Sequence, residues 1–564
     1  MRNALKIIWQ CDRKGFLLKL LYTALGSILP LANLYVLKVM VNGITSVALG
    51  YYGQPNDFLV DSHFTFFTFQ HSVSGISAVL ISIAVFCAIM LLNRLISILG
   101  SLNGEILTQK LIDHINGLIQ TQSLHLDMTF YDNPRFHDTF HRAQQEAAFR
   151  PIRILENLVS VFGALISLGG VAVMLLVASW QVVVVMLVAM IPTFTVRLVK
   201  SRRIYRFRRE TTQLARRSSY YGALLTNRIY AKEVRAFAVG DYLRSLYVSI
   251  RRQLVDRLLR ISRRLAVYDA LTSIVEVGAV GICVFLMLKP VSTGAITVGS
   301  FVMLFEAFRR GQGYLSSLVG GISGLYEHKL FINNLFEFLE LKPNITTPDN
   351  PEPFPERVTK VEFDDVTFSY PDMMQPTLSH FSFRAERGEV SYIRGENGFG
   401  KTTMLKLLLR LYDPQQGSVR INGIDIRRFS LADLRRNVSA IFQDYVQLQL
   451  TVRENVEFGD LNHRGDALRL ADALRNADAE TIVNNLPKGI DTQLGRQFDD
   501  GQELSMGQWQ RVALARQLFA DGQVLFFDEP TAWMDKDARE HFIHLLDDLC
   551  KSHVVLLVQH SIEE

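Results

Sequence analysis

The sequence predicts a membrane protein with six transmembrane α-helices and long cytoplasmic extensions, followed by an α/β domain. Hydrophobic residues make up 49% of the 564 residues and gather in long runs before about residue 325. Five prolines between Pro343 and Pro355 then indicate an extended linker. From Val358 onward, strand and helix patterns alternate as in a mostly parallel sheet. A chain of this length holds at least two domains, and these observations place the division between them.

The N-terminus is expected to form a helix at the membrane surface. Basic residues surround Leu5, Ile7, Ile8 and Trp9 there, and no small-residue cleavage site follows, so a removed signal peptide is disfavoured. The expected divisions are an interfacial helix (1–15), a membrane domain (16–325), a linker (326–357) and an α/β domain (358–564).

Six apolar stretches are long enough to cross a bilayer as helices. They are approximately Phe16–Thr45, Ile76–Ile98, Ile154–Ala178, Trp180–Val196, Leu265–Leu288 and Ile296–Leu318. The segments 99–153 and 197–264 are longer than loops require and have helical patterns. We therefore expect the spans to extend beyond the membrane. Residues 129–134 and 227–233 are candidate tips that could contact the second domain, although plain helix-turn-helix bends would explain them equally well.

Positive charge predicts the orientation of these spans. Arginines and lysines crowd the segment from Arg197 to Arg264, whereas Ser46–Ser74 contains neither residue. The positive-inside rule places both termini and the α/β domain in the cytoplasm, at the plasma (inner) membrane. Because the basic residues adjoin apolar spans, we interpret them as membrane-flanking and expect no nucleic-acid partner. The four cysteines lie far apart in the sequence, which predicts reduced thiols.

A glycine-rich loop in the second domain has the spacing of a phosphate-binding loop. Its residues are Gly395, Glu396, Asn397, Gly398, Phe399, Gly400, Lys401, Thr402 and Thr403. Glycines let backbone N–H groups converge on a phosphate, Lys401 reaches the β- and γ-phosphates, and the Thr402 hydroxyl suits Mg²⁺. An apolar strand precedes the loop and an apolar helix follows it, which disfavours a merely structural turn. The pattern predicts a nucleotide site.

Two carboxylates follow a buried strand later in the chain. Val524–Phe527 delivers Asp528 and Glu529 at its carboxyl end, where ligands bind in open α/β sheets. Asp528 suits Mg²⁺, and Glu529 is placed to polarise an attacking water.

At this point the chain resembles the ATP-binding cassette exporters that fuse a membrane half to an ATPase half. The resemblance covers nearly the whole chain. It identifies Tyr370 as the aromatic that stacks on adenine, Gln443 as a residue contacting metal and water, and His560 as the switch histidine. Leu504-Ser505-Met506-Gly507-Gln508 is similar to the signature that closes on ATP held by the facing subunit. Taken alone, Tyr370 could be an ordinary strand aromatic and His560 a surface histidine.

The resemblance implies ATP and Mg²⁺ as cofactors, with Glu529, His560, Gln443 and Lys401 as catalytic residues. It implies nucleotide contacts from Tyr370, the phosphate loop, Ser505, Gly507 and Gln508, and metal contacts from Thr402, Gln443 and Asp528. It also implies a dimer, most simply of two identical chains, that exports an amphiphilic substrate across the bilayer. Within the family, Phe130–Pro134 and Glu503–Gln510 look most like exporters of modified peptides.

Several residues depart from the family pattern. Met506 replaces the first signature glycine, Phe399 is large for its loop position, and Trp533 and Met534 are bulky for a contact loop. Met506 leaves a weakly hydrolysing regulatory subunit of a heterodimer as one alternative. On the substrate, the alternative to a peptide is a lipid or drug exporter or flippase.

Charged residues also lie within the last two spans. Helix rise puts Glu276 and Arg309 at about the same depth, roughly 20 Å from the outer ends of their spans, and Glu306 and Arg310 flank Arg309. Because charges facing lipid are costly, we expect Glu276 and Arg309 to face each other or a wet cavity. The four residues are candidates for the substrate pathway, with an ion pair that only locks two helices as the alternative.

Overall fold

The computed structural model describes residues 2–48, 75–132, 150–178, 180–293, 296–371, 373, 375–395, 400–531, 534 and 536–559. Contacts divide the chain into two compact units. The first unit comprises Met1–Gln122 and His141–Glu340, and the second unit comprises Ser123–Phe140 and Leu341–Glu564. A short segment between two predicted spans is thus grouped with the α/β half of the chain.

The first unit consists of helices. They are α1 (Arg2–Cys11), α2 (Arg13–Ala48), α3 (Gly75–His125, whose last residues are grouped with the second unit), α6 (Arg150–Ala178), α7 (Trp180–Glu210), α8 (Thr212–Thr226), α9 (Arg228–Ala236), α10 (Gly240–Ser292) and α11 (Val298–Leu339). The predicted helical extension of the spans is confirmed in α3, α7 and α10, which continue well past their apolar stretches. The second candidate tip, 227–233, lies within the first unit as the start of α9.

Within the described residues, five helices are long and apolar enough to cross a membrane: α2, α3, α6, α7 and α10. Helix α11 falls outside this group and carries Glu306, Arg309 and Arg310. The structure therefore supports a multi-pass membrane unit, while a sixth crossing by α11 stays a prediction.

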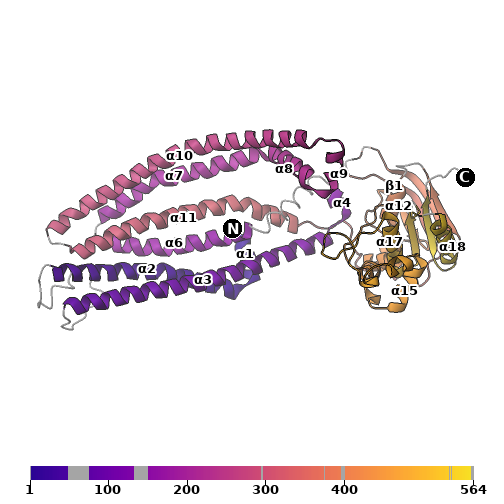
Figure 1. The fold of residues 1–564 in the computed structure, drawn as a ribbon, viewed down its shortest axis with the longest axis horizontal. Helices are drawn as coiled ribbons and strands as arrows, with labels where there is room; N and C mark the ends of the chain where they lie inside the picture. Colours follow the sequence, from indigo (N-terminus) through magenta and orange to yellow (C-terminus); the bar gives the residue numbers. More distant parts are fainter. Residues whose placement is uncertain are drawn as a thin grey trace. The chain divides into compact units, whose positions relative to one another are not determined.

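Pairwise packing sets the arrangement of these helices. Helix α10 packs along α7, and α11 packs along α6 and α2 (Figure 1). Close approach of α11 and α6 depends on glycine: a Cβ at Gly324 would lie 2.4 Å from the Asn157 amide nitrogen, and one at Gly321 would lie 2.6 Å from Val161. The consecutive helices α10 and α11 are thus not each other's main partners.

The N-terminal helix α1 has the expected amphipathic character. Ile7 and Ile8 are buried, whereas Leu5 and Trp9 are exposed. The Arg13 guanidinium lies 4.6 Å from the Trp9 ring centroid, a cation–π distance. An exposed apolar face beside basic residues is typical of a helix at a membrane surface.

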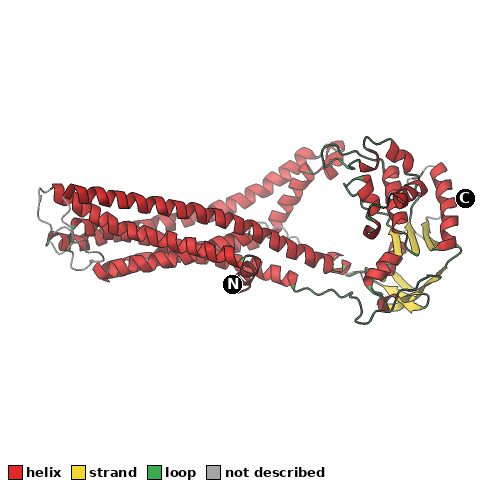
Figure 2. Ribbon diagram, turned by 90° about the horizontal axis from the view of Figure 1, so that it is seen from below, coloured by secondary structure: helices red, strands yellow, loops and turns green. Residues whose placement is uncertain are grey.

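The second unit holds two sheets (Figure 2). The parallel sheet has the order β3 (Val390–Arg394), β8 (Val554–Gln559), β7 (Val524–Asp528) and β6 (Val438–Ile441). The antiparallel sheet has the order β2 (Leu378–Glu386), β1 (Lys360–Phe368), β4 (Gln416–Ile421) and β5 (Ile424–Asp425). The continuous apolar runs of β7 and β8 are buried, as expected for central parallel strands. The alternation of strands and helices in the sequence predicts the parallel sheet, whereas the antiparallel sheet is a finding of the structure.

Helices accompany these sheets and enclose two apolar cores. They are α4 (Met128–Asp132), α12 (Lys401–Leu408), α13 (Leu431–Asn437), α14 (Val452–Glu457), α15 (Ala467–Asn476), α16 (Glu480–Asn484), α17 (Met506–Ala520) and α18 (Lys536–Ser552). One core contains α12 and the antiparallel sheet, and the other contains α14, α15 and α17. The parallel sheet contributes side chains to both.

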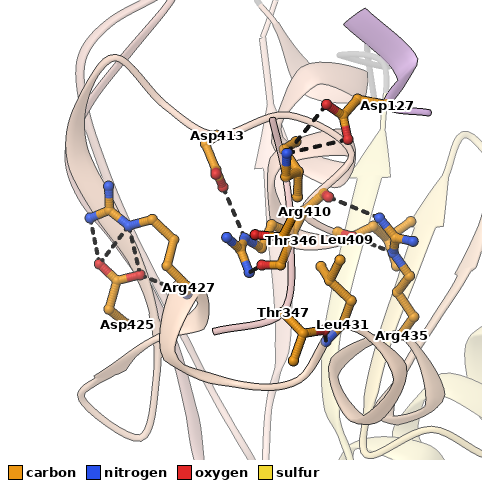
Figure 3. A network of polar contacts seen from close by, with 11 residues as sticks. Asp127, Thr346, Thr347, Leu409, Arg410, Asp413, Asp425, Arg427, Leu431 and Arg435 are labelled. Carbon is orange, nitrogen blue, oxygen red and sulfur yellow. Dashed lines mark hydrogen bonds and ion pairs between the residues drawn. The ribbon is translucent and has the colours of Figure 1, made fainter. Parts of the chain in front are cut away.

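The linker is held by polar contacts within the second unit (Figure 3). The Asp127 carboxylate accepts hydrogen bonds from the backbone N–H groups of Asn344 (2.5 Å) and Ile345 (3.2 Å). Arg410 donates to the Thr346 carbonyl at 3.1 Å. Helix α11 continues to Leu339, so the first part of the segment expected as linker is helical and the extended part begins near Leu341.

Candidate functional site

Several of the predicted site residues lie at the carboxyl edge of the parallel sheet. Gly395 follows β3, Gln443 lies just beyond β6, and Asp528 and Glu529 end β7. Parallel strands end on one side of their sheet, so these residues meet although they are far apart in the sequence. His560 follows β8, and it lies outside the described residues.

The phosphate loop leads into α12 through Gly400. This residue has φ +87°, in the left-handed region, and an added Cβ would lie 2.7 Å from a Leu378 methyl carbon. Backbone conformation and close packing therefore both require glycine here. Residues 396–399 lie outside the described residues, so the predicted contacts of Glu396, Asn397, Gly398 and Phe399 stay predictions.

Lys401 lies under the start of this loop. Its Nζ donates to the Gly395 carbonyl at 2.9 Å and lies 4.0 Å from the Glu529 carboxylate. The residue is only 7% exposed. Because Lys401 is buried, water would only weakly screen the attraction between its ammonium group and a phosphate bound in the loop.

Thr402 and Asp528 form the candidate metal position. The Thr402 hydroxyl donates to the Asp528 carboxylate at 2.7 Å, and Asp528 is 2% exposed. Burial raises the pKa of Asp528, and the hydrogen bond from Thr402 opposes that rise. A hydroxyl, a carboxylate and the nearby Gln443 amide oxygen are hard oxygen donors, the set that Mg²⁺ prefers, so the residues present fit this ion.

Gln443 contacts Glu529, the second of the two carboxylates at the end of β7. Its side-chain amide donates to Glu529 at 2.7 Å. Glu529 has φ +53°, an uncommon conformation for a residue that is not glycine. Strained backbone is often found where surrounding structure fixes a functional side chain, and here the Gln443 contact orients the Glu529 carboxylate.

Tyr370 is part of an aromatic group beside α12. Its ring meets Phe368 at 5.0 Å and Tyr412 at 5.4 Å, both edge-on, and Lys406 Nζ lies 5.0 Å from its centroid. Its hydroxyl shares a 3.1 Å hydrogen bond with the hydroxyl of Thr403, in the helix that follows the phosphate loop. These contacts place the predicted adenine-stacking ring next to the phosphate site.

The signature residues begin α17. Ser505 caps the helix: its hydroxyl accepts from the Gln508 N–H at 3.3 Å, and the Gln508 side chain accepts from the Ser505 N–H at 2.9 Å. Met506 is 45% exposed. Tyr445 donates to the Met506 carbonyl at 3.0 Å, and the Gln447 amide lies 3.3 Å from its sulfur. The segment after Gln443 therefore supports the first turn of the signature helix.

Comparison with known proteins agrees with this geometry. A family described as "ABC transporter" matches residues 378–532. The subtilin transport ATP-binding protein of Bacillus subtilis is 24% identical over 100% of this chain and 87% of its own length. The nisin transport ATP-binding protein of Lactococcus lactis subsp. lactis is 23% identical over 99% of this chain and 89% of its own length. The chain is an ATP-binding cassette exporter with fused membrane and ATPase halves.

Two further relatives extend the comparison of this exporter. The ATP-dependent lipid A-core flippase of Vibrio cholerae is 27% identical over 78% of this chain and 74% of its own length. A solved structure of a bacterial Atm1-family ABC exporter with ATP bound has a TM-score of 0.77 and covers 97% of this chain and 91% of its own, at 20% identity. That likeness shows the shared fold.

Of the two expectations for Glu276 and Arg309 in the exporter, a contact between them is wrong, whereas their placement at a wet cavity stays a prediction. Glu276 accepts a hydrogen bond from Thr193 at 2.7 Å, and Arg309 donates twice to Glu306, each time at 2.8 Å. Arg310 also donates to Glu306, at 2.9 Å. Equal depth does not bring the two residues together, because α10 packs along α7 whereas α11 packs along α6 and α2.

Tyr412 is a supporting residue of the exporter's second unit that no local sequence pattern predicts. Tyr412, which supports Tyr370, donates its hydroxyl to Asp132 on α4. Burial raises the pKa of Tyr412, and the hydrogen bond to Asp132 raises it further. Asp132 lies in the first candidate tip, so the predicted contact of residues 129–134 with the ATPase half is confirmed for this residue. Tyr412 stands near a Pro-containing turn, and only its proximity to the phosphate loop could have drawn attention to it.

Proposed function

We propose that this exporter works as a homodimer in the plasma membrane, and that Mg²⁺-dependent ATP hydrolysis moves an amphiphilic substrate out of the cytoplasm. The observation that carries the proposal is the meeting of Lys401, the Thr402–Asp528 pair and the Gln443–Glu529 pair at one sheet edge. Phosphoryl transfer needs these elements: a phosphate cradle, hard oxygen donors and a group that orients water.

Each residue at the edge has a proposed role. Lys401 holds the β- and γ-phosphates, and Glu529 orients and polarises the attacking water. Gln443 holds Glu529 until the terminal phosphate arrives, and His560 contacts that phosphate. When bound, Mg²⁺ would be held by Thr402, Asp528 and Gln443, and it would neutralise phosphate charge.

The signature supports the dimeric proposal. Ser505 and Gln508 use their side chains to cap α17, and Gly507 lies between them in the first turn of this capped helix. In the proposed dimer, this helix start faces ATP held by the other copy. Two identical chains then form two complete sites related by a two-fold axis.

For the membrane half, we propose that α11 is the sixth span and that both chain termini lie in the cytoplasm. The division into an interfacial helix (1–15), membrane domain (16–325), linker (326–357) and ATPase domain (358–564) is kept as a working proposal. Glu276, Glu306, Arg309 and Arg310 are proposed to border the substrate pathway, since charged side chains within a membrane half favour polar cavities.

A modified peptide is the proposed substrate. The two relatives that match nearly the whole chain are named for subtilin and nisin transport, which supports a peptide. Relatives named lipid A-core flippases support a lipid as the second candidate. A weakly hydrolysing regulatory role is less favoured, because the phosphate lysine, the metal donors and Glu529 are all present and in contact.

The test uses inside-out vesicles that contain the purified full-length chain. We expect ATP-dependent accumulation of a cationic modified peptide, together with peptide-stimulated ATPase activity. The Glu529→Gln variant serves as the transport-dead control. ATP-dependent movement of a labelled lipid without peptide accumulation would replace the first candidate by the second. Loss of ATPase activity in the purified single chain would favour the regulatory role.

A further inference from the structure

A small pocket lies between α7 and α11 in the first unit. Its volume is about 210 Å³. Leu187, Ile191 and Phe194 of α7 and Leu315 of α11 form much of its apolar wall. Its polar end holds Arg197, which is partly buried. The pocket is smaller than the several hundred Å³ typical of sites that enclose a drug-sized molecule, so it suits one part of a larger amphiphile.

Arg197 and Ser316, at the polar end of the pocket, lie at about the same distance from the starts of their helices. At 1.5 Å per residue, about 26 Å of α7 separates Trp180 from Arg197, and about 27 Å of α11 separates Val298 from Ser316. The hydrocarbon core of a bilayer is about 30 Å thick. With the orientation proposed above, Arg197 lies near the cytoplasmic boundary of that core, and Leu187 and Ile191 lie closer to its centre.

Some hydrogen-bond donors of the Arg197 guanidinium remain available to a ligand. Its guanidinium donates to the Ser316 carbonyl at 2.7 Å and to the Ser316 hydroxyl. A guanidinium has five N–H donors in a planar fork, so donors remain for a further acceptor. No carboxylate among the described residues lies within ion-pair distance of Arg197, although arginines elsewhere on α7 and α11 have such partners.

The described acidic groups near the pocket form no ion pair with Arg197. Glu276 accepts from Thr193, which also lines the pocket, and Asp269 pairs with Lys200 at 3.0 Å. Among the described residues, Arg197 is therefore a cation at the end of an apolar pocket without a carboxylate counter-ion. An uncompensated cation in a poorly hydrated place is costly, and a ligand anion would remove that cost.

We propose that this pocket binds an acidic phospholipid from the cytoplasmic leaflet. The phosphate accepts hydrogen bonds from the free donors of Arg197, and the upper part of one acyl chain lies against Ile191 and Leu187. Arginine suits this role because its fork matches phosphate oxygens in pairs. The order of the pocket, with charge towards the cytoplasm and apolar wall towards the bilayer centre, matches a lipid that stands in the inner leaflet. Ile191 is 62% exposed, so the apolar wall is open at the protein surface.

The test measures lipid binding to the full-length dimer by native mass spectrometry, with phosphatidylglycerol and phosphatidylcholine as probes. We expect phosphatidylglycerol to bind more tightly, and Arg197→Gln to weaken its binding about tenfold or more. Arg203→Gln removes the same charge from an exposed position on α7 and should leave binding near wild type. Equal binding of the two lipids, or equal losses in the two variants, would overturn the proposal.

Two more variants separate binding from folding. Ile191→Trp fills the apolar part without a change in charge and should also weaken binding, whereas Arg197→Lys keeps the charge and should retain most of it. If Ile191→Trp binds phosphatidylglycerol as tightly as wild type does, the acyl chain of the lipid does not lie in the pocket and the proposal fails. A second copy of the protein covering the pocket would give the same negative result.

The proposal rests on the membrane orientation given above but not on the substrate. Peptide-stimulated ATPase activity of wild type reports on the proposed function alone. Its absence together with selective phosphatidylglycerol binding would leave the lipid site standing. Its presence without selective binding would overturn only the site.

Discussion

The ATP site and the charged cluster on α11 (Glu306, Arg309 and Arg310) both contain carboxylates that accept hydrogen bonds. The two sites are built differently. In the ATP site, Gln443 follows β6 while Asp528 and Glu529 lie at the end of β7, and the contacts of these residues join parts far apart in the sequence. In the α11 cluster, Glu306 contacts Arg309 and Arg310 of its own helix, three and four residues on. The first arrangement requires a folded sheet, whereas the second requires only a helix.

This difference has consequences for function. Side chains from separate elements can be rearranged by a ligand. In the proposed mechanism, the Gln443–Glu529 hydrogen bond exchanges for contacts to ATP and water. The α11 cluster pairs its one carboxylate with two arginines of the same helix and keeps a net positive charge. It reaches α2 through the Arg310 guanidinium, which donates to the Pro30 carbonyl at 3.3 Å. Substitutions at the ATP site should therefore act mainly on catalysis, and those in the cluster mainly on stability.

The largest effect is expected for Glu529→Gln. An amide cannot polarise the attacking water, so steady-state ATP hydrolysis should fall by about 100-fold or more while ATP binding persists. Turnover and nucleotide binding are measured on the purified protein. Glu540→Gln, the same change at an exposed position on α18, should leave turnover near wild type. Half of the wild-type rate in Glu529→Gln would remove this residue from its proposed role.

Substitution of Tyr412 tests whether aromatic support extends the ATP site. Tyr412→Ala removes the ring beside Tyr370, and an aromatic pair contributes about 0.5–1.5 kcal/mol, so the KM for ATP should rise about threefold to tenfold. Tyr412→Phe keeps the ring and loses only the hydrogen bond to Asp132, so its KM should stay close to wild type. An equal rise in both variants would show that the hydroxyl, not the ring, supports the site.

Met506→Gly tests the departure from the family signature. Our hypothesis is that the exposed Met506 side chain crowds the facing nucleotide and slows closure of the dimer. The variant should then raise ATPase activity severalfold. Met506→Leu keeps a side chain of similar volume and should not raise it. A lower rate in Met506→Gly would mean that the contact with Gln447 matters more than crowding.

The smallest effects are expected in the membrane half, where the α11 cluster can be compared with Glu276. Glu306→Gln leaves Arg309 and Arg310 without a counter-charge, and thermal melting should drop by a few degrees. Glu276→Gln can still accept from Thr193 and should melt close to wild type. If Glu276 borders the substrate pathway, its variant should lose substrate-stimulated ATPase activity while basal activity persists. Parallel loss of both activities and of thermal stability would leave it a structural role.

Local patterns were sufficient to predict much of this protein. Apolar runs of the right length predicted the long helices, because burial of backbone polar groups within lipid leaves few alternatives to a helix. The glycine spacing before Lys401 and the acids after Val524–Phe527 predicted the nucleotide site, because strands of a parallel sheet end on a common edge. In both cases the chemistry is encoded within a few consecutive residues.

Only the tertiary structure decided which distant residues meet. Depth along a helix follows from sequence, but helix partners do not. Equal depth therefore leaves open whether Glu276 meets Arg309, and in the structure α7 supplies the contact of Glu276 through Thr193. The same holds for Tyr412 with Asp132 and for Arg197 with Ser316, pairs that no local pattern links. The physical reason is that helix periodicity and strand order act over a few residues, whereas partner choice depends on packing between surfaces of the whole fold.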